Sequence, residues 1–459
     1  MNKDLVEKQK PKKIVVIGAG LSGLTTAFRL SENKQDVEVY EARSRVGGRI
    51  LTVNVNGHLA ELGGENISNG GQASHTVGLI HDLHLQTQAT KSIFNIYYCE
   101  NGQLSSFTQL LKENPFSSDL KNRLEEIAGK CKNMHEVLLA LFPDRGLAYK
   151  VSRATLASYE GAPVEHLSVF YIETLYHLLL GGLSAAHQNT QKQGPVYIDR
   201  MVISGGNSVL PETLAAQLQG RVHLNHALVE VGKDSQGTYV LRFENGRKVT
   251  ADILVFSIPC PVFKDITVSD AVIPVEKKRD IESICYGTPS KILVPVSGES
   301  AIEKQYTDGG VLFTFFNRSR HVANMYYTGG HGQFTEETIQ EIFKRDFPLM
   351  QKIYTTESDL QPVLSNDQSF FCYAGPVGHS WPNDPFAQGA YSCVGAGQEE
   401  LFTSIIEVKG QRVKSLFAPI DESLFFAGEH TSILLDLGGT IEAAVESGER
   451  IARLIENYR

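Results

Sequence analysis

The order of apolar and polar positions near the N-terminus predicts a strand, a helix and a second strand. Residues Ile14–Ile17 form a short apolar run rich in β-branched side chains, as in a buried parallel strand. Apolar positions then recur at helical spacing over Ser22–Leu30, and Val37–Tyr40 is a second apolar run. We therefore expect a strand–helix–strand unit whose strands are buried in a parallel sheet.

The pattern changes several times along the rest of the chain. Helical spacing prevails from residue 78 to about residue 199, and strand patterns with glycines return after it. A β-meander is expected over 222–231, 239–243 and 248–258, turning at Asn245-Gly246. The other expected elements are helices over 120–127, 134–141, 167–180, 209–218, 336–347 and 441–455, and strands over 292–296, 311–317, 323–328 and 425–428.

Composition and charge exclude some classes of partner. The chain has 459 residues, more than a usual single domain, so two domains are expected. Its hydrophobic content of 42% and charged content of 21% are ordinary for a globular enzyme. A net charge of -9 argues against a nucleic-acid partner and an anionic membrane surface, and weakly favours cationic substrates.

The cysteines and the N-terminal segment bear on location. The six cysteines are scattered, without a C-x-x-C pair or metal-ligand spacing, so we expect reduced, mostly buried thiols and no metal site. The polar, basic N-terminal segment lacks the apolar core of a secretory signal, and no apolar run is long enough to span a membrane. We expect a cytoplasmic protein without a membrane-anchoring tail.

A glycine-rich turn separates the first predicted strand from the first helix. Its G-x-G-x-x-G spacing permits a tight turn, close approach of a pyrophosphate, and close packing of helix on strand. The helix N-terminus would point N–H groups at the phosphates. A turn of this kind can also serve plain chain reversal, but the flanking strands and helix favour a nucleotide site. The residues of this predicted phosphate site are Gly18, Gly20, Leu21, Ser22 and Gly23.

The residues after the second strand narrow the choice of ligand. Glu41 ends that strand, where a carboxylate can accept hydrogen bonds from a ribose hydroxyl and would repel a 2′-phosphate. Arg43 and Arg49 add guanidinium groups that suit phosphate contacts, beside the glycines Gly47 and Gly48. This stretch, E-A-R-x-x-x-G-G-R, resembles the flavin-binding stretch of the flavin-containing amine oxidase family, where it serves FAD rather than NAD.

The resemblance extends over most of the chain, in three blocks that stand in the family order. They are the N-terminal unit, Tyr286–Val296 and Trp381–Arg450. The family includes monoamine, polyamine and L-amino-acid oxidases. It implies an α/β and α+β fold in which a Rossmann-like FAD-binding domain is interleaved with a mixed helical and β-sheet substrate domain. The expected boundaries are 12–84, 200–280 and 381–459 for the FAD-binding domain, and 85–199 and 281–380 for the substrate domain.

The resemblance implies two catalytic residues, Lys291 and Tyr391. Lys291 matches the family lysine that faces flavin N5 through a water, where an ammonium can stabilise charge on reduced flavin and on oxygen. Outside this motif, a single lysine at the start of a strand would be taken for a surface residue. Tyr391 matches one wall of an aromatic pair that guides the amine. The second wall falls on Thr440, which cannot form it, so the substrate class stays open.

The remaining cofactor contacts are likewise implied by the resemblance. Trp381 matches an aromatic beside the flavin ring, Glu429 a contact to the ribitol chain, and Leu228 a backbone contact to the adenine. Ile441 begins a helix whose N-terminus would favour the anionic reduced flavin. Ala390 stands where some members carry a cysteine bonded to the flavin, so FAD should be held non-covalently. The expected contacts beyond the phosphate site are Glu41, Ala42, Arg43, Gly48, Arg49, Leu62, Gly63, Gly64, Glu65, Leu228, Trp381, Gly428, Glu429, Thr440 and Ile441.

The expected substrate cavity contains Asn66, Tyr391 and Thr440. Asn66 occupies the position of a carboxylate-binding arginine in some L-amino-acid oxidases, and an amide cannot pair a carboxylate in that way. An acid of some polyamine oxidases would fall on Ser68. Glu65 is the only nearby acid. It could bind a cationic amine, or its side chain could simply be solvated.

These observations predict an FAD-dependent amine oxidase. It would take hydride from the carbon next to an amine nitrogen, reduce O2 to H2O2, and give an imine that hydrolyses to a carbonyl product. A small-molecule amine and O2 are the expected partners, and a homodimer is left open. An L-amino-acid oxidase is the alternative, followed by a related flavin desaturase. An NAD-dependent dehydrogenase would not need the block at 428–441, and an inactive flavin-binding module would not need Lys291 and Tyr391.

Overall fold

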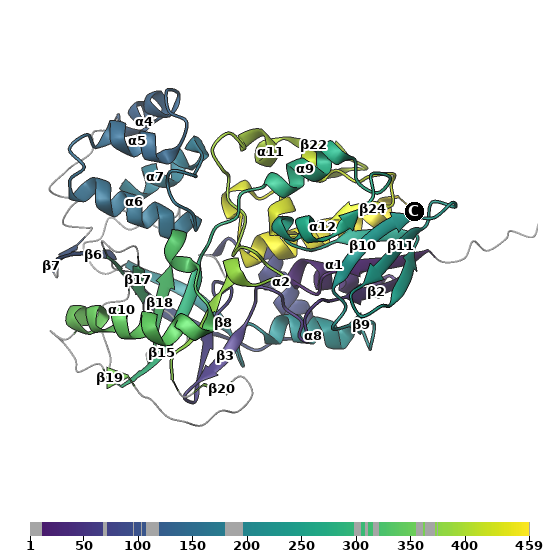
Figure 1. Ribbon diagram of the computed structural model, residues 1–459, viewed down its shortest axis with the longest axis horizontal. Helices are drawn as coiled ribbons and strands as arrows, with labels where there is room; N and C mark the ends of the chain where they lie inside the picture. The colour runs from purple at the N-terminus through teal and green to yellow at the C-terminus, as the bar shows by residue number, and fades with distance from the viewer. Residues whose placement is uncertain are drawn as a thin grey trace, which may run out of the picture.

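The computed structural model describes residues 12–67, 71–94, 96–101, 103–106, 119–179, 196–297, 304–307, 311–314, 321–354, 361–362, 372–373 and 375–458. Within them the chain is a mixed α/β protein with several sheets. Figure 1 shows a parallel sheet with its helices at one end of the molecule, and another sheet with a group of helices at the other end.

A five-stranded parallel sheet forms the centre of the first end. Its order is β24-β13-β1-β2-β9, and every neighbouring pair is parallel. The side chains of β1 divide between two separate core clusters, so both faces of the sheet are covered and an unbroken apolar run is required. The two strands predicted nearest the N-terminus are confirmed. The strands are β1 (Lys13–Ile17), β2 (Asp36–Tyr40), β9 (Val222–His223), β13 (Ile253–Phe256) and β24 (Leu424–Phe426).

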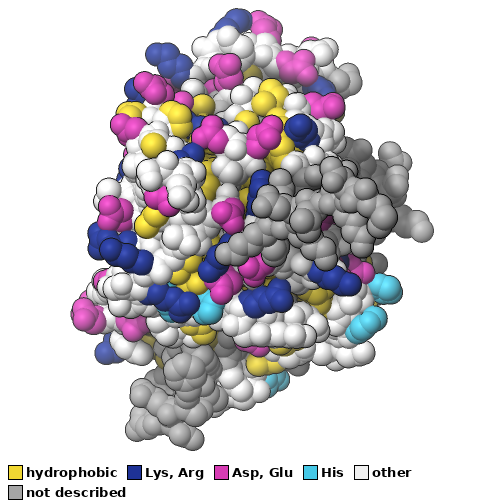
Figure 2. Space-filling model, turned by 90° about the vertical axis from the view of Figure 1, so that its right-hand side faces the viewer, with side chains coloured by type: hydrophobic (Ala, Val, Ile, Leu, Met, Phe, Trp, Pro, Cys, Tyr) yellow, Lys and Arg dark blue, Asp and Glu magenta, His cyan; other side chains and the backbone are white. Residues whose placement is uncertain are grey.

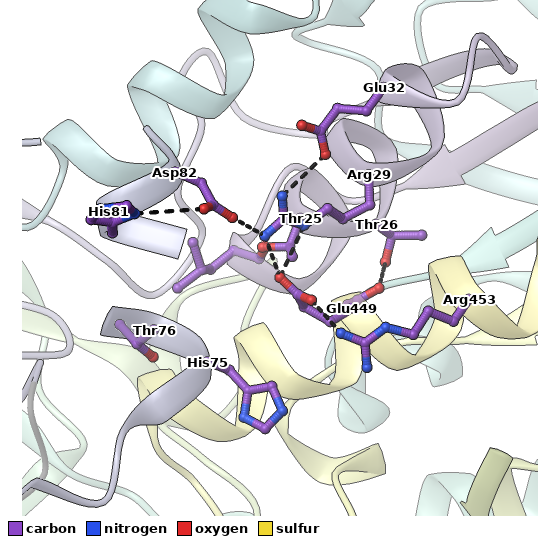
Figure 3. A network of polar contacts seen from close by, with 12 residues as sticks. Thr25, Thr26, Arg29, Glu32, His75, Thr76, His81, Asp82, Glu449 and Arg453 are labelled. Atoms are coloured by element: carbon purple, nitrogen blue, oxygen red, sulfur yellow. Dashed lines mark hydrogen bonds and ion pairs between the residues drawn. The ribbon is translucent and has the colours of Figure 1, made fainter. Parts of the chain in front are cut away.

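Two helices, one from each end of the sequence, lie together against this sheet. They are α1 (Leu21–Glu32) and α12 (Ile441–Asn457), and both were predicted (Figure 1). Figure 3 shows the polar network at their edge. There Arg29 of α1 donates to Glu449 of α12 at 3.0 and 2.7 Å, and to the last residue of α2 (Ser74–Asp82) at 2.6 Å. One side chain therefore ties three helices together.

The predicted β-meander is divided between two sheets. The strands β10 (Leu228–Lys233), β11 (Tyr239–Phe243) and β12 (Lys248–Ala251) form an antiparallel sheet, which β14 (Thr267–Val268) joins parallel to β10. The predicted strand over 222–231 was too long, because its first residues belong to β9 of the parallel sheet. The strand over 248–258 was likewise two strands, β12 and β13.

Backbone and side-chain hydrogen bonds explain both divisions. Between β9 and β10, the N–H groups of Asn225 and His226 donate to the carbonyls of Arg43 and Glu41 at 2.9 and 2.8 Å. The chain therefore passes over the end of β2 before it changes sheets. Between β12 and β13, the carboxylate of Asp252 accepts from the N–H of Lys13 at 2.7 Å, which pins the crossing to β1.

An eight-stranded sheet lies at the other end of the molecule. Its main path is β19-β15-β18-β17-β16-β6-β7, and β21 also pairs with β15. Helix α10 (Ile339–Tyr354) packs on it through apolar side chains that include Phe343 and Phe347. The expected mixture of strands and a helix is confirmed, although residues 315–317 lie outside the described residues. The strands are β6 (Ile96–Glu100), β7 (Gln103–Ser106), β15 (Ser290–Ser297), β16 (Lys304–Thr307), β17 (Val311–Thr314), β18 (Val322–Tyr327), β19 (Gln361–Pro362) and β21 (Val377–Ser380).

A group of helices stands beside this sheet in Figure 1. They are α4 (Leu120–Ala128), α5 (Met134–Leu141), α6 (Leu147–Glu160) and α7 (Ile172–Leu179). The sequence predicted α4, α5 and α7, the last of which is preceded by a 3₁₀ turn rather than by α-helix. The expectation that helical spacing prevails over 78–199 was wrong for the described residues of 87–106, which form β5 (Thr87–Phe94), β6 and β7. It did not predict α6, because the buried face of that helix includes Ser152 and Thr155. Small polar residues at buried positions weaken the apolar period.

Among the helices in the ranges given above, none combines the length and the apolar character that crossing a membrane requires. Figure 2 shows acidic and basic side chains interspersed on one face of the molecule, without a field of a single sign there.

The remaining strands and α-helices are β3 (Thr52–Val55), β4 (His58–Glu61), β8 (Val196–Ile203), β20 (Cys372–Tyr373), β22 (Ile405–Val408), β23 (Gln411–Lys414), α8 (Val209–Gln217), α9 (Val275–Ser283) and α11 (Glu399–Thr403).

Candidate active site

The glycine loop between β1 and α1 has the geometry that its spacing predicts. Gly18 has φ +104°, and a Cβ on Gly23 would lie 2.2 Å from the carbonyl oxygen of Gly18. A Cβ on Gly20, by contrast, would meet nothing within 4 Å. Gly20 also precedes α1 without a side-chain cap, and Leu21 begins the helix. Two of the glycines are therefore required by packing within the protein, and the third faces open space at a helix N-terminus.

The end of β2 holds Glu41 beside this loop. The buried carboxylate accepts from the N–H of Ala19 at 2.7 Å and from the N–H of Arg43 at 2.9 Å. Ala42 lies between Glu41 and Arg43 in the chain. At the start of α1, the hydroxyl of Ser22 is 2.8 Å from that of Ser257. Two fixed donors orient the carboxylate, and its remaining lone pairs can accept from a ligand.

The two arginines of the E-A-R-x-x-x-G-G-R stretch have acidic partners. Arg43 hydrogen-bonds Asp384 and lies over the ring of Phe386. Burial raises the pKa of Asp384, but hydrogen bonds from His379 and Arg43 hold it well below its usual range. Arg43 is thus already paired with an acid that its sequence motif did not reveal.

Arg49 connects the three blocks of the sequence. Its guanidinium donates to the carbonyl of Ala390 at 2.8 Å and to Glu429 at 2.9 Å, and it lies 5.7 Å from the ring centroid of Tyr286. Glu429 also accepts from the N–H and hydroxyl of Ser392 at 3.0 and 2.7 Å. Burial raises the pKa of Glu429, but Arg49 and the other neighbours outweigh it, so the pKa lies below its ordinary value.

The stretch that contains Glu429 is held by buried contacts. A Cβ on Gly428, which has φ +145°, would overlap the ring of His430. His430 Nδ1 lies 3.1 Å from the hydroxyl of Tyr286. Burial lowers the pKa of His430 to about 3, so its imidazole is neutral. A neutral, fully enclosed ring therefore fixes the backbone beside the acid.

Lys291 spans the loop that follows β4. The residue is 7% exposed, and its ammonium donates to the carbonyls of Glu61 and Gly63 at 2.9 and 3.1 Å and to Glu65 at 3.1 Å. Lys291 is therefore not a surface residue. Glu65, for which amine binding and solvation were both open, forms an ion pair with it. Asn66 is exposed next to this pair, and Ser68 lies outside the described residues.

Further contacts fix the Leu62–Glu65 loop. Two of the residues that make them, Asn207 and Glu61, were not identified as site residues from the sequence. The amide of Asn207 donates to the carbonyls of Gly64 and Glu65 at 3.0 and 3.1 Å. Its own N–H donates to the buried carboxylate of Glu61 at 2.9 Å. The only available signal was Asn207 itself, placed directly after two glycines. Trp381 also donates to the carbonyl of Leu62 at 3.3 Å, and Ile441 packs on Gly64.

Tyr391 stands between two glycines, Gly161 and Gly439. A Cβ on Gly161 or on Gly439 would lie 2.7 Å from its ring or hydroxyl. Its hydroxyl lies 3.2 Å from the hydroxyl of Tyr326 and 3.2 Å from the carbonyl of Tyr159. Burial raises the pKa of Tyr391 well above its ordinary value. Tyr326 is an aromatic neighbour that the sequence did not identify.

Thr440, the expected place of the second wall, serves as the N-cap of α12. Its hydroxyl accepts from the N–H of Ala443 at 3.1 Å and donates to the carbonyl of Leu437 at 2.6 Å. Leu228 begins β10, two residues after His226, which bonds to the backbone of Glu41. Contacts of Arg49 with Ala390 and Glu429, and of Trp381 with Leu62, thus join the N-terminal and C-terminal blocks.

Comparison with known proteins finds relatives that match most of this chain. An L-amino-acid oxidase of Mus musculus is 26% identical, over 98% of this chain and 71% of its own length. A lysine-specific histone demethylase 1B homolog of Caenorhabditis elegans is 25% identical over 91% of this chain, which spans about half, 53%, of that relative.

Solved structures share the fold at low sequence identity. A cyclohexylamine oxidase from Brevibacterium oxydans matches with a TM-score of 0.71 at 16% identity, over 97% of this chain and 99% of that one. A variant of putrescine oxidase matches with a TM-score of 0.69 at 16% identity and the same coverage. The family model described as flavin containing amine oxidoreductase matches residues 21–456. The chain therefore belongs to the flavin-containing amine oxidoreductases, and it is an FAD-dependent oxidoreductase that acts on amines.

Proposed function

We propose that this protein is an amine oxidase that takes hydride from the carbon next to an amine nitrogen and passes the electrons to O2, forming H2O2. The observation that carries the proposal is the placement of Lys291. Its buried ammonium holds the Leu62–Glu65 loop, and its cross-strand partner Tyr326 reaches Tyr391. A fixed positive charge and a pair of tyrosines are thus linked through the neighbouring strands β15 and β18, and the family resemblance places the flavin ring beside them.

The residues present fit FAD. The open space at Gly20, the uncapped start of α1 and the oriented carboxylate of Glu41 suit a pyrophosphate and a ribose. Glu429 and Arg49 would hold the sugar-alcohol chain. FAD, when bound, supplies the hydride acceptor and the route of electrons to oxygen. Ala390, buried against Trp381, offers no sulfur for a covalent link, so we propose non-covalent binding.

The protein side chains would act by position and charge. Tyr391 and Tyr326 would orient the amine, since glycine contacts fix the ring of Tyr391 and its hydroxyl bonds to that of Tyr326. The ammonium of Lys291 would stabilise negative charge as oxygen is reduced, because burial and three hydrogen bonds hold it in place. The imine product would leave the site and hydrolyse to a carbonyl compound.

The parallel sheet supports the proposed division into domains. Its strands come from three separate segments: β1 and β2 from 12–84, β9 and β13 from 200–280, and β24 from 381–459. We propose that these segments form the Rossmann-like FAD-binding domain. Segments 85–199 and 281–380 would form the substrate domain, which is supported by the pairing of β6 with β16. A cytoplasmic location and a homodimer stay predictions.

We further propose that the substrate is a cationic amine without a carboxylate beside the reacting carbon. An unpaired buried carboxylate costs several kcal/mol, about 2 or more. Asn66 carries no charge, and the ammonium of Lys291 is already bonded to the carboxylate of Glu65 and to two carbonyls, so neither offers the substrate a free cation. Arg153 pairs with Glu165 at 2.9 Å and is 48% exposed, so it does not supply one. Arg318 lies outside the described residues. Oxidation of α-amino acids is the alternative, favoured by the relatives named as L-amino-acid oxidases.

An anaerobic screen that reads flavin bleaching tests the proposal. Putrescine, spermidine and benzylamine are compared with leucine, phenylalanine and lysine, and kcat/KM is then measured with oxygen for every compound that bleaches the flavin. We expect the amines to be preferred. A preference for an α-amino acid of about ten-fold, or about 1.4 kcal/mol, would replace the amine proposal by its alternative.

A further inference from the structure

Two cysteines from distant parts of the sequence face each other at the edge of the candidate site. The sulfur atoms of Cys285 and Cys393 are 3.3 Å apart, and the N–H of Cys393 donates to the carbonyl of Cys285 at 2.9 Å. Their neighbours Tyr286 and Ser392 form an antiparallel bridge. The two thiols are therefore a cross-strand pair on two short antiparallel segments, not two scattered cysteines.

The surroundings of the two thiols differ. Cys285 is partly exposed, whereas Cys393 is 2% exposed. The thiol of Cys393 donates to the sulfur of Cys285, and this bond lowers the pKa of Cys285 although burial opposes it. The same bond and burial raise the pKa of Cys393 well above its ordinary value. Cys285 is thus the accessible thiol with the greater thiolate character, and Cys393 stands behind it as a resolving thiol.

We propose that Cys285 and Cys393 form a reversible disulfide in response to hydrogen peroxide. The Cys285 thiolate attacks one peroxide oxygen, the O–O bond breaks, and a sulfenic acid and one water are formed. The sulfur of Cys393 then attacks the Cys285 sulfur; the S–S bond forms, the S–O bond breaks, and a second water leaves. The thiols lose two electrons and two protons to one peroxide, and a low-molecular-weight thiol such as glutathione reverses the change.

The disulfide would join two segments that carry parts of the site. One leads from Tyr286 into the strand of Lys291, and the other carries Tyr391 and Ser392, which holds Glu429. The bond would close a loop of 108 residues and draw the sulfurs together to about 2.05 Å. Closing so long a loop restricts the unfolded chain, so the oxidised protein should melt about 3 °C or more above the reduced protein.

The source of the peroxide rests on the proposed function, because an oxidase would produce it next to the pair. Purified holoenzyme is treated in one arm with equimolar hydrogen peroxide and in another with oxygen and the amine that has the highest kcat/KM in the screen described above. Free thiols are then blocked by alkylation, and the digested protein is analysed by mass spectrometry. We expect a cross-link between the Cys285 and Cys393 peptides in both arms, lost after glutathione treatment.

Variants and controls separate the possible outcomes. In Cys285→Ser and Cys393→Ser the peroxide-dependent rise in Tm should disappear, whereas Cys131→Ser should retain it. Cys131 is a suitable control because it is also partly exposed, but burial raises its pKa. A cross-link with added peroxide but not with turnover supports the thiol pair and counts against the oxidase reaction. Peroxide treatment that leaves both thiols free, or overoxidises Cys285 without joining it to Cys393, overturns the inference.

Discussion

The two ends of the candidate site are encoded in different ways. The cofactor end is the glycine loop, Glu41 and the Arg49–Glu429 pair, and most of it follows from one continuous stretch near the N-terminus. The amine end is the Leu62–Glu65 loop with Lys291, Tyr326 and Tyr391, and it is assembled from segments hundreds of residues apart. Binding of the cofactor therefore depends mostly on local backbone geometry, with Glu429 as its distant contribution, whereas orientation of the amine depends on tertiary contacts that can vary independently.

The largest expected effect tests whether Lys291 acts by charge or by holding the loop. Lys291→Met should slow reoxidation of the reduced enzyme by oxygen about 10²-fold, the size expected from losing one preorganised charge. Reduction by the amine should change less. Stopped-flow absorbance of the flavin measures both half-reactions.

Glu65→Gln supplies the matched comparison. It removes the ion pair with Lys291 but keeps the ammonium and its hydrogen bonds to the carbonyls of Glu61 and Gly63. Reoxidation should then stay within about three-fold of the unaltered enzyme. Equal slowing by both substitutions would assign Lys291 a positioning role in the loop.

At the cofactor end, His430 should make stability depend on pH. Its pKa is lowered to about 3 by burial, from an ordinary value of 6.5. A lowered pKa means that the unfolded chain binds more protons between these values, so stability is complete above about pH 6.5 and is lost as the pH falls. At pH 5 the free energy of unfolding should be about 2 kcal/mol lower than at neutral pH because of His430.

Urea unfolding of His430→Gln at pH 7 and pH 5 measures this contribution. The variant keeps a hydrogen-bonding side chain beside Tyr286 but does not titrate, so it should lose about 2 kcal/mol less than the unaltered protein between the two pH values. An unaltered pH dependence in His430→Gln would place the sensitive group elsewhere.

The features that the sequence predicted correctly are those encoded within one short stretch of the chain. The strand, glycine turn and helix at 13–32 follow from the apolar pattern and the glycine spacing of one short stretch, and all were found. Asn207 and Glu61 were missed because they meet across 146 residues, and no periodicity indicates such a contact. The pairing of Arg43 with Asp384 and that of Cys285 with Cys393 were missed for the same reason. The resemblance located Lys291, which composition and spacing alone would have left on the surface.

The substitution Gly20→Ala tests the cofactor end by geometry alone. Its added methyl group meets no protein atom within 4 Å, so the protein should fold normally. If the open space is where the pyrophosphate lies, FAD should bind about 10-fold more weakly, the usual cost of an overpacked contact. Fluorescence titration of the apoprotein gives the Kd. Gly232→Ala, whose methyl group also meets nothing, should bind FAD normally, and equal affinity in both variants would move the ligand away from Gly20.

The smallest effect concerns Tyr326, the aromatic residue that the sequence did not reveal. Successive side chains of β18 point to opposite faces. The hydroxyl of Tyr326 lies 3.2 Å from that of Tyr391, and the hydroxyl of Tyr327 donates to Asp346 of α10 at 2.9 Å. Tyr326→Phe removes one hydrogen bond at the amine end, worth about 1 kcal/mol, so kcat/KM for the best amine should fall about five-fold without loss of FAD. Tyr327→Phe removes a comparable bond on the other face and should lower the Tm but not kcat/KM. If the two substitutions affect kcat/KM equally, Tyr326 contributes through the stability of β18 and not through contact with the amine.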